Sequence, residues 1–331
     1  MRLTESASEP RVRRVAVVGA DGFIGRHLAA ALRATGMETT GYTRQRELLW
    51  RAAGSAGTQR PDVVFYLASS ITPALAEQHR EWVLADHRRF AALLAGLSRS
   101  ADPPTVVLAS SGGTVYDAAL PPPYREDAPT RATSPYGAAK LALERLLLSR
   151  VGVLPTAILR LSNVYGPGQR TGKSQGVLAY WLRAAATGQP LPLIGDPDAV
   201  RDYVYIDDVV DCMCRVANRA PTGADPLILN VGSGQGTSLR SLMSTVERVV
   251  GRELVVRRMP GRSVDRSAVW LDVRRAAHVL GWRPRTALAD GVAAMWREAR
   301  GLVARPGWIA AGDGIGRLPQ MDDARVDARG V

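Results

Sequence analysis

The stretch Val15-Ala16-Val17-Val18-Gly19-Ala20-Asp21-Gly22-Phe23-Ile24-Gly25 contains a short apolar run, then three glycines spaced three apart, and an apolar-periodic segment follows over 27–34. This order predicts a strand, a glycine turn and a helix. Glycines in such a turn let a pyrophosphate approach the N–H groups at the amino end of the helix. The stretch therefore predicts a dinucleotide site, whose expected contacts here are Gly19, Asp21, Gly22, Phe23, Ile24 and Gly25.

Further apolar runs continue this pattern along the chain. Strands are expected over 38–43, 63–68, 105–110 and 156–161, with helical patterns between them. Strands that alternate with helices predict an α/β protein with a Rossmann-like, doubly wound parallel sheet. Ligands bind such sheets at the carboxyl ends of the strands.

The strict alternation stops after Tyr165-Gly166-Pro167-Gly168. Helical patterns over 177–187, 207–218, 239–250 and 273–280 are separated by short strands and Gly/Pro loops, which predicts a smaller α/β lobe over the carboxyl edge of the sheet. We expect a frayed start at 1–11, a dinucleotide-binding domain at 12–165, a mainly ligand-binding lobe at 166–304 and a flexible tail at 305–331. Residues 201–220 are expected to pack back onto the first domain.

Composition excludes several classes of function. The 331-residue chain has a net charge of +12, but its arginines are spread out without a basic tail or an aromatic-interleaved stripe, so we expect no nucleic-acid partner. No apolar run approaches the length of a membrane span, and the start does not resemble a signal peptide, so we expect a soluble, cytoplasmic protein. Cys212 and Cys214 lie two apart in a predicted helix and point apart, which favours buried thiols over a disulfide or metal site.

The segment Ser134-Pro135-Tyr136-Gly137-Ala138-Ala139-Lys140 contains one of only two lysines among 43 basic residues. Ser134 can cap a helix and Pro135 suits its first position, so Tyr136 and Lys140 would lie one turn apart on one face. A nearby ammonium stabilises a phenolate, which a tyrosine that donates or accepts protons needs. Taken alone, the segment also fits a surface helix with an aromatic and a cation one turn apart.

The end of the second predicted strand bears on the choice of cofactor. Thr43 and Arg44 stand where many dinucleotide folds place an acid that binds the adenosine 2′-hydroxyl. An acid would repel a 2′-phosphate, whereas threonine and arginine can bind one, so NADP(H) is favoured over NAD. The alternative is that Arg44 is one solvated arginine among many and that NAD is used. Only about 16 residues, 45–60, then precede the third strand, too few for a further helix and strand.

Together these patterns resemble the extended short-chain dehydrogenases/reductases that act on nucleotide sugars, over about residues 13–300. The motifs that carry the resemblance are Gly19/Gly22/Gly25, Tyr66-Leu67-Ala68, Ser110-Ser111-Gly112-Gly113-Thr114-Val115-Tyr116, Tyr136-x-x-x-Lys140, Leu159-Arg160-Leu161-Ser162-Asn163-Val164-Tyr165-Gly166-Pro167, Arg201-Asp202-Tyr203-Val204-Tyr205-Ile206-Asp207-Asp208 and Asn230-Val231-Gly232-Ser233-Gly234.

The resemblance implies roles for particular residues. Tyr136 would exchange a proton with a sugar oxygen, while Lys140 would support the tyrosine and hold the nicotinamide ribose. The family commonly has its catalytic Ser or Thr where this chain has Gly112, so we assign that role to Ser111, although a structural serine remains an alternative. Further expected contacts are Leu67 and Ala68 with the cofactor, and Asn163, Arg201 and Arg262 with the nucleoside diphosphate.

These implications favour an NADPH-dependent reductase that converts the ketone of a nucleoside-diphosphate-4-keto-deoxysugar into an alcohol. The nearest alternative is a nucleotide-sugar 4-epimerase of the UDP-galactose type, which keeps NAD bound. The family's dehydratases typically carry Asp-Glu where this chain has Gly112-Gly113, which disfavours dehydration. A protein of a different class, a non-catalytic NADP(H)-binding protein, stays open because the serine is displaced. Family habit suggests a homodimer, and no metal is expected.

Overall fold

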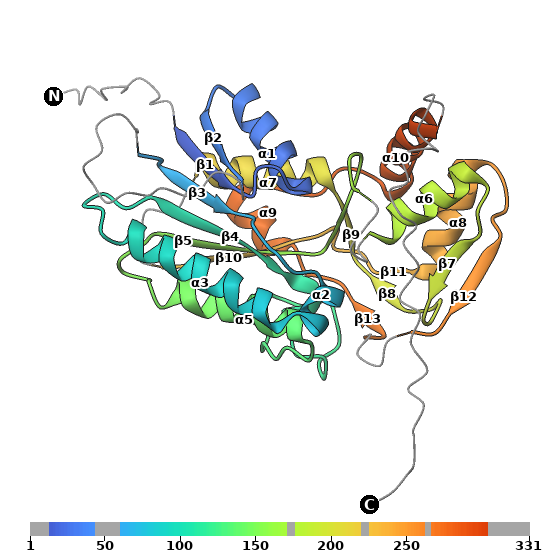
Figure 1. Cartoon of the computed structure of the whole chain (residues 1–331), viewed down its shortest axis with the longest axis horizontal. Coiled ribbons are helices and arrows are strands. Elements are labelled where there is room, and N and C mark those ends of the chain that lie inside the picture. The colour runs from blue at the N-terminus through green and yellow to red at the C-terminus, as the bar shows by residue number, and fades with distance from the viewer. Residues whose placement is uncertain (1–12, 44–59, 171–175, 220–224, 262–265, 304–331) are drawn as a thin grey trace, which may run out of the picture.

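A computed structural model describes residues 13–43, 60–170, 176–219, 225–261 and 266–303 (Figure 1). Its centre is a parallel sheet of six strands. Their order across the sheet is β10 (Leu227–Val231), β5 (Thr156–Leu161), β4 (Thr105–Ser111), β3 (Val63–Tyr66), β1 (Arg14–Val18) and β2 (Glu38–Tyr42). The predicted doubly wound α/β sheet is confirmed, although the third strand ends at Tyr66 and leaves Leu67 and Ala68 in the loop that follows.

Strand β2 is the last strand on its side of the sheet within the described ranges. From β2 the chain returns across β1 to form β3, so the order of strands reverses on the two sides of β1. Such a reversal opens a crevice at the carboxyl ends of the strands, where ligands of doubly wound folds bind.

Helices cover both faces of the sheet, as Figure 1 shows. Helices α1 (Phe23–Ala34) and α7 (Ile206–Asn218) pack on one face, and α3 (Arg80–Leu97) and α5 (Pro135–Leu148) pack on the other. Strand β1 serves both cores, because Val15 and Val17 belong to the first core and Ala16 and Val18 to the second. An apolar strand that is buried on both faces explains the uninterrupted apolar run Val15-Ala16-Val17-Val18.

Helix α7 carries both cysteines of the chain into the core. It packs against α1, and Cys212 and Cys214 are buried free thiols, as the sequence predicts. Helix α9 (Arg274–Leu280) lies next to β10 and α7. A segment from the second half of the chain thus completes the core around the sheet.

A smaller lobe lies at one end of the sheet (Figure 1). Its core lies between α6 (Val177–Thr187), α8 (Leu239–Val250) and α10 (Leu288–Val303), with Trp181 and Leu242 fully buried. Short strands complete it: β7 (Leu191–Ile194) with β12 (Val256–Met259), and β8 (Val200–Arg201) between β11 (Thr237–Ser238) and β13 (Ala268–Val269). The strand pair β6 (Asn163–Tyr165) and β9 (Tyr203–Tyr205) connects β5 to this lobe.

None of the helices in the described ranges is both long enough and apolar enough to cross a membrane.

Candidate active site at the carboxyl edge of the sheet

The glycine turn joins β1 to α1 and lies against the segment that follows β3. Gly19 has φ +91°, and a Cβ there would lie 2.9 Å from Ala68 N. A Cβ on Gly25 would lie 2.0 Å from Gly19 O, so the first turn of α1 closes only over glycine. The chain is therefore drawn close around the carboxyl end of β1, where Leu67 N also donates to Val18 O at 2.9 Å.

Among the described residues, no side chain caps the first amides of helix α1. Gly22 is the N-cap residue, no side-chain hydrogen bond closes this end, and no acid lies in the first turn. Asp21 and Gly22 are exposed, and Phe23 and Ile24 are half-buried. Free N–H groups and the positive end of the helix dipole suit an anion such as a pyrophosphate. The residues present thus fit a dinucleotide.

Thr43 follows β2 directly and lies near this turn, because Gly19 N and Ala20 N donate to Tyr42 O at 2.8 and 3.2 Å. No acid stands at this strand end in the described part of the chain. Arg44, the other residue in the prediction of NADP(H), lies outside the described residues, and so does Arg262.

The Tyr136 and Lys140 side chains lie together on the first turns of α5. The Ser134 hydroxyl caps this helix by accepting from Gly137 N at 3.2 Å, and Pro135 is its first residue. The Lys140 Nζ atom lies 5.6 Å from the centre of the Tyr136 ring, within the range of a cation–π interaction. Lys140 is 8% exposed, and Tyr136 packs against a small cluster that contains Ile71 and Ala139.

Two serines at the end of β4 differ in their surroundings. The buried Ser110 hydroxyl donates to a Glu144 carboxylate oxygen. Ser111 is half-buried, pairs with Leu161 of β5 and precedes the short helix α4 (Gly112–Val115). Within the described ranges no side-chain hydrogen bond holds Ser111, so its hydroxyl can turn toward a ligand.

A buried ion pair lies one helical turn beyond Lys140. Glu144 accepts from Arg160 of β5, with Arg160 Nη2 2.8 Å from Glu144 Oε2, and their side chains are 2% and 5% exposed. Burial lowers the pKa of Arg160, but the hydrogen bonds and charge of Glu144 outweigh this and raise it overall. The pair ties α5 to β5, and the Ser110 hydroxyl ties the same carboxylate to β4. Sequence reasoning missed it, because the pattern predicts helix and strand but not which buried charges meet.

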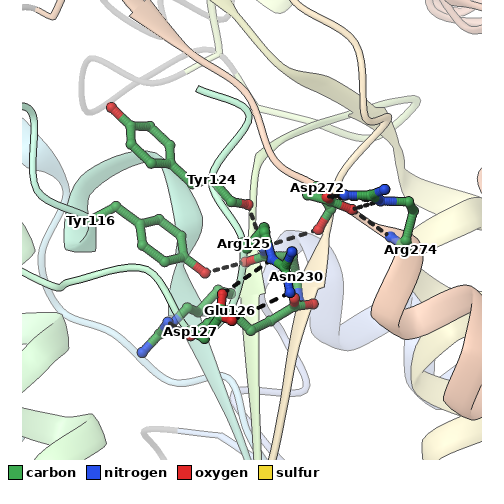
Figure 2. A network of polar contacts seen from close by, with 9 residues as sticks. Tyr116, Tyr124, Arg125, Glu126, Asp127, Asn230, Asp272 and Arg274 are labelled. Atoms are coloured by element: carbon green, nitrogen blue, oxygen red, sulfur yellow. Dashed lines mark hydrogen bonds and ion pairs between the residues drawn. The ribbon is translucent and has the colours of Figure 1, made fainter. Parts of the chain in front are cut away.

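Asn230, at the end of β10, forms the hub of a second network (Figure 2). Its Oδ1 atom accepts from the Tyr116 hydroxyl at 2.5 Å, and its Nδ2 atom donates to the carbonyl oxygens of Tyr124 and Asp272 at 2.8 and 3.1 Å. Burial raises the pKa of Tyr116 to about 12, so this phenol stays protonated at neutral pH. The Asn230 motif therefore joins the sheet to the chain that follows β13.

Two of the predicted diphosphate contacts lie on either side of buried Asp202. Asn163 donates to Asp202 O from both its N and Nδ2 atoms at 3.0 Å, and the Arg201 guanidinium donates to Val200 O at 2.8 Å. No ion pair among the described residues involves Arg201, which leaves its charge available. Asn163 comes two residues after Leu161, the partner of Ser111, and thus stands at the same carboxyl edge as the serine.

No cation pairs with Asp202 in the described part of the chain. It is 1% exposed and accepts from Ser233 N and Ser233 Oγ at 2.7 Å each, and from Leu271 N at 3.2 Å. Burial raises its pKa. Asp202 thereby fixes the backbone next to Arg201, which explains an acid at this position of the motif.

The described residues contain no group of three or more His, Cys, Asp or Glu side chains that could hold a metal ion.

An uncapped glycine turn and a tyrosine–lysine helix at one edge of a doubly wound sheet are typical of the short-chain dehydrogenases/reductases. The model of the "NAD dependent epimerase/dehydratase family" matches residues 15–232, and the chain belongs to this family. It is thus a nicotinamide-dependent enzyme of the extended short-chain type, as the motifs predicted.

Named relatives include both an epimerase and a reductase. A UDP-glucose 4-epimerase of Mycolicibacterium smegmatis is 33% identical over 85% of this chain and 96% of its own length. A dTDP-4-dehydro-6-deoxyglucose reductase of Escherichia coli is also 33% identical, over 59% of this chain and 61% of its own length. Among solved structures, the UDP-glucose 4-epimerase of Thermotoga maritima with UDP-glucose matches with a TM-score of 0.79 and 26% identity, over 88% of this chain and 99% of that one.

Proposed function

We propose that this protein uses NADPH to reduce the C4 ketone of a nucleoside-diphosphate-4-keto-deoxysugar to an alcohol. The observation that carries the proposal is the end of β2, where Thr43 and not an acid stands next to the pyrophosphate turn. A site without that acid accepts a 2′-phosphate, and NADPH is the cofactor of net reduction. The similarity to a dTDP-4-dehydro-6-deoxyglucose reductase supports a keto sugar as substrate.

Each site residue has a proposed part in this reaction. When bound, the reduced nicotinamide supplies a hydride to the sugar carbon. Tyr136 gives its proton to the sugar oxygen, and the Lys140 ammonium next to its ring stabilises the phenolate that remains. Ser111 donates to the same oxygen as negative charge develops on it.

The substrate's diphosphate is assigned to the seam between sheet and lobe. The Arg201 guanidinium donates to Val200 O but has no acidic partner among the described residues, and Asn163 stands at the adjoining strand end. A charge-assisted donor suits a diphosphate. Arg262 is proposed as a second cation for this anion on its sequence position alone.

Cofactor preference tests the reductase. We expect the purified protein to consume NADPH in proportion to sugar reduced, and to use NADH poorly. Arg44→Ala should weaken NADPH binding far more than NADH binding, with Arg219→Ala, an exposed arginine at the end of α7, as the matched control. Tightly held NAD with no response to NADPH would overturn the reductase.

The second candidate is an NAD-dependent nucleotide-sugar 4-epimerase. It is favoured by the similarity, over nearly their full lengths, to UDP-glucose 4-epimerases of M. smegmatis and T. maritima. An epimerase would interconvert UDP-glucose and UDP-galactose without net consumption of cofactor. Tyr136→Phe separates both enzymes from a non-catalytic binder: either enzyme loses about 10²- to 10⁴-fold in turnover while it still binds cofactor.

A further inference from the structure

The short helix α4 places one hydroxyl directly beside the catalytic helix. A Cβ on Gly137 would lie 2.6 Å from Thr114 O and 3.2 Å from Thr114 Cβ. Gly137 is the residue after Tyr136, and it is buried in the first turn of α5. Thr114 therefore packs against the backbone that carries the proposed proton donor.

Gly112, two residues earlier, has no room for a side chain. A Cβ there would lie 2.6 and 2.9 Å from the two methyl carbons of Leu271, and 3.2 Å from Arg160 O. Leu271 is itself buried in a cluster with Val115 and Leu141. Leu271 thus fills the space that a side chain at position 112 would need. The Ser110 hydroxyl, for its part, is bonded to Glu144.

The Thr114 hydroxyl, in contrast, has no hydrogen-bond partner among the described residues. Its Oγ1 atom is shielded from solvent and has no hydrogen-bond partner in the described part of the chain. Other hydroxyls at helices here bond back to a carbonyl, as Thr35 does to Leu32 O at 2.8 Å and Thr187 to Arg183 O at 3.0 Å. A buried hydroxyl without a partner costs free energy, so its missing partner needs a physical explanation.

Space for such a partner lies next to it. A Cβ added to Gly113 would meet no atom within 4 Å, whereas those added to Gly112 on α4 and to Gly137 on α5 would clash. A ligand atom can therefore approach α4 over Gly113. Rotation about one bond, χ1, turns the Thr114 hydroxyl among its staggered positions.

We propose that Thr114 donates a hydrogen bond to the sugar oxygen that Tyr136 protonates, as a second hydroxyl donor next to Ser111. This inference rests on the proposed function and deepens it. A donor held in place before the reaction stabilises the charge that develops on this oxygen. Thr114 is then a catalytic residue. The observation that points to it is its buried hydroxyl, which has no partner among the described residues.

Thr114→Val tests the inference, because valine keeps the shape and removes the hydroxyl. Loss of one such donor should lower kcat about 10²- to 10³-fold and raise KM about tenfold, and Thr114→Ser should restore most of the turnover. The melting temperature of Thr114→Val should equal or exceed that of the wild type, because an unpaired buried hydroxyl has been removed. A purely structural threonine would give the opposite result, a lower melting temperature with turnover kept.

A control and a binding measurement complete the test. Thr156→Val removes another buried hydroxyl, which bonds Leu154 O at 2.9 Å at the amino end of β5, and should leave kcat unchanged. With NADP⁺ present, Thr114→Val should bind dTDP-4-keto-6-deoxyglucose about tenfold more weakly than the wild type, but bind dTDP equally well. Wild-type turnover and affinity in Thr114→Val would overturn the inference alone, whereas a wild type that binds no nucleotide sugar overturns the proposed function and this inference together.

Discussion

Two buried carboxylates support the candidate site, one on the helix that carries Tyr136 and Lys140 and one next to Asn163 and Arg201. They are stabilised in different ways. Glu144 lies on helix α5, one turn beyond Lys140, and pairs with the Arg160 guanidinium. Asp202 lies beside the strand pair β6 and β9, which leads to the smaller lobe, and within the described ranges it accepts from backbone N–H groups and a serine hydroxyl, with no cation. Each holds the element next to a cation, Lys140 in one half and Arg201 in the other.

The difference shows what each half needs. A charged pair gives a rigid, directional link between α5 and the sheet, but removal of one partner leaves an uncompensated charge in the core. Neutral donors around Asp202 avoid a second cation next to Arg201, so the charge of Arg201 remains available for an anion. Without a cationic partner, the charged form of Asp202 is destabilised by burial, and its pKa is raised.

The largest expected effect comes from separating the buried pair. Glu144→Met leaves Arg160 charged and buried, and should lower the free energy of unfolding by about 3 to 5 kcal/mol in urea titrations. Glu144→Met combined with Arg160→Met removes both charges and should recover at least half of that loss. If the double variant were less stable than Glu144→Met alone, Arg160 would stabilise the fold through contacts other than its ion pair with Glu144.

A smaller effect is expected at Asp202. In Asp202→Asn, an amide N–H group replaces one of the two oxygens that accept from Ser233 and Leu271. This loss of an acceptor should lower the free energy of unfolding by about 1 to 3 kcal/mol. The raised pKa gives this cost a pH dependence. Native Asp202 binds its proton more tightly than the unfolded chain, whose aspartate pKa is about 3.9, so the wild type loses stability as the pH rises through the native pKa.

The difference in stability between wild type and Asp202→Asn should therefore be greatest below about pH 4 and shrink as the pH rises. Urea titrations of both proteins across this pH range measure it. If the stability difference between the two proteins grew with pH, the fold would stabilise Asp202 as an anion. Asp202 would then resemble Glu144 in being held in its charged form.

The smallest effect is expected at an exposed pair. Arg240 and Asp198 lie 2.9 Å apart but are 56% and 66% exposed. Water and salt screen such a pair, so Asp198→Asn should leave the urea midpoint unchanged within error. If Asp198→Asn lost as much stability as Asp202→Asn, the burial of a carboxylate would not determine how much its replacement destabilises the fold.

The sequence predicted the sheet, the glycine turn and α5 well, because each depends on local signals. Alternating apolar runs predict strands and helices, and Ser134-Pro135 predicts the start of α5 at the residue where it begins. Helices over 177–187 and 239–250 were predicted to their ends. Helices α1 and α7 begin earlier than the periodicity suggested, at Phe23 and Ile206, because their first turns lack a regular apolar pattern.

Contacts between distant segments could not be predicted in the same way. Leu271 and Gly112 are far apart in the chain, and only the fold shows that one fills the space next to the other. The Glu144–Arg160 pair joins a helix to a strand, with neither charge marked by its neighbours. The roles of Ser111, Asn163 and Arg201, and the homodimer, stay predictions for experiment.

The buried helix α7 makes the protein convenient for chemical labelling. Burial raises the pKa of both thiols, that of Cys214 to about 11, so few thiolates exist at neutral pH and alkylating reagents should react slowly with either cysteine. A cysteine introduced at Gly113, where an added Cβ meets open space, would then be the fast-reacting thiol of the chain. A fluorophore attached there would report whether a sugar occupies the space over α4, without any change to the native cysteines.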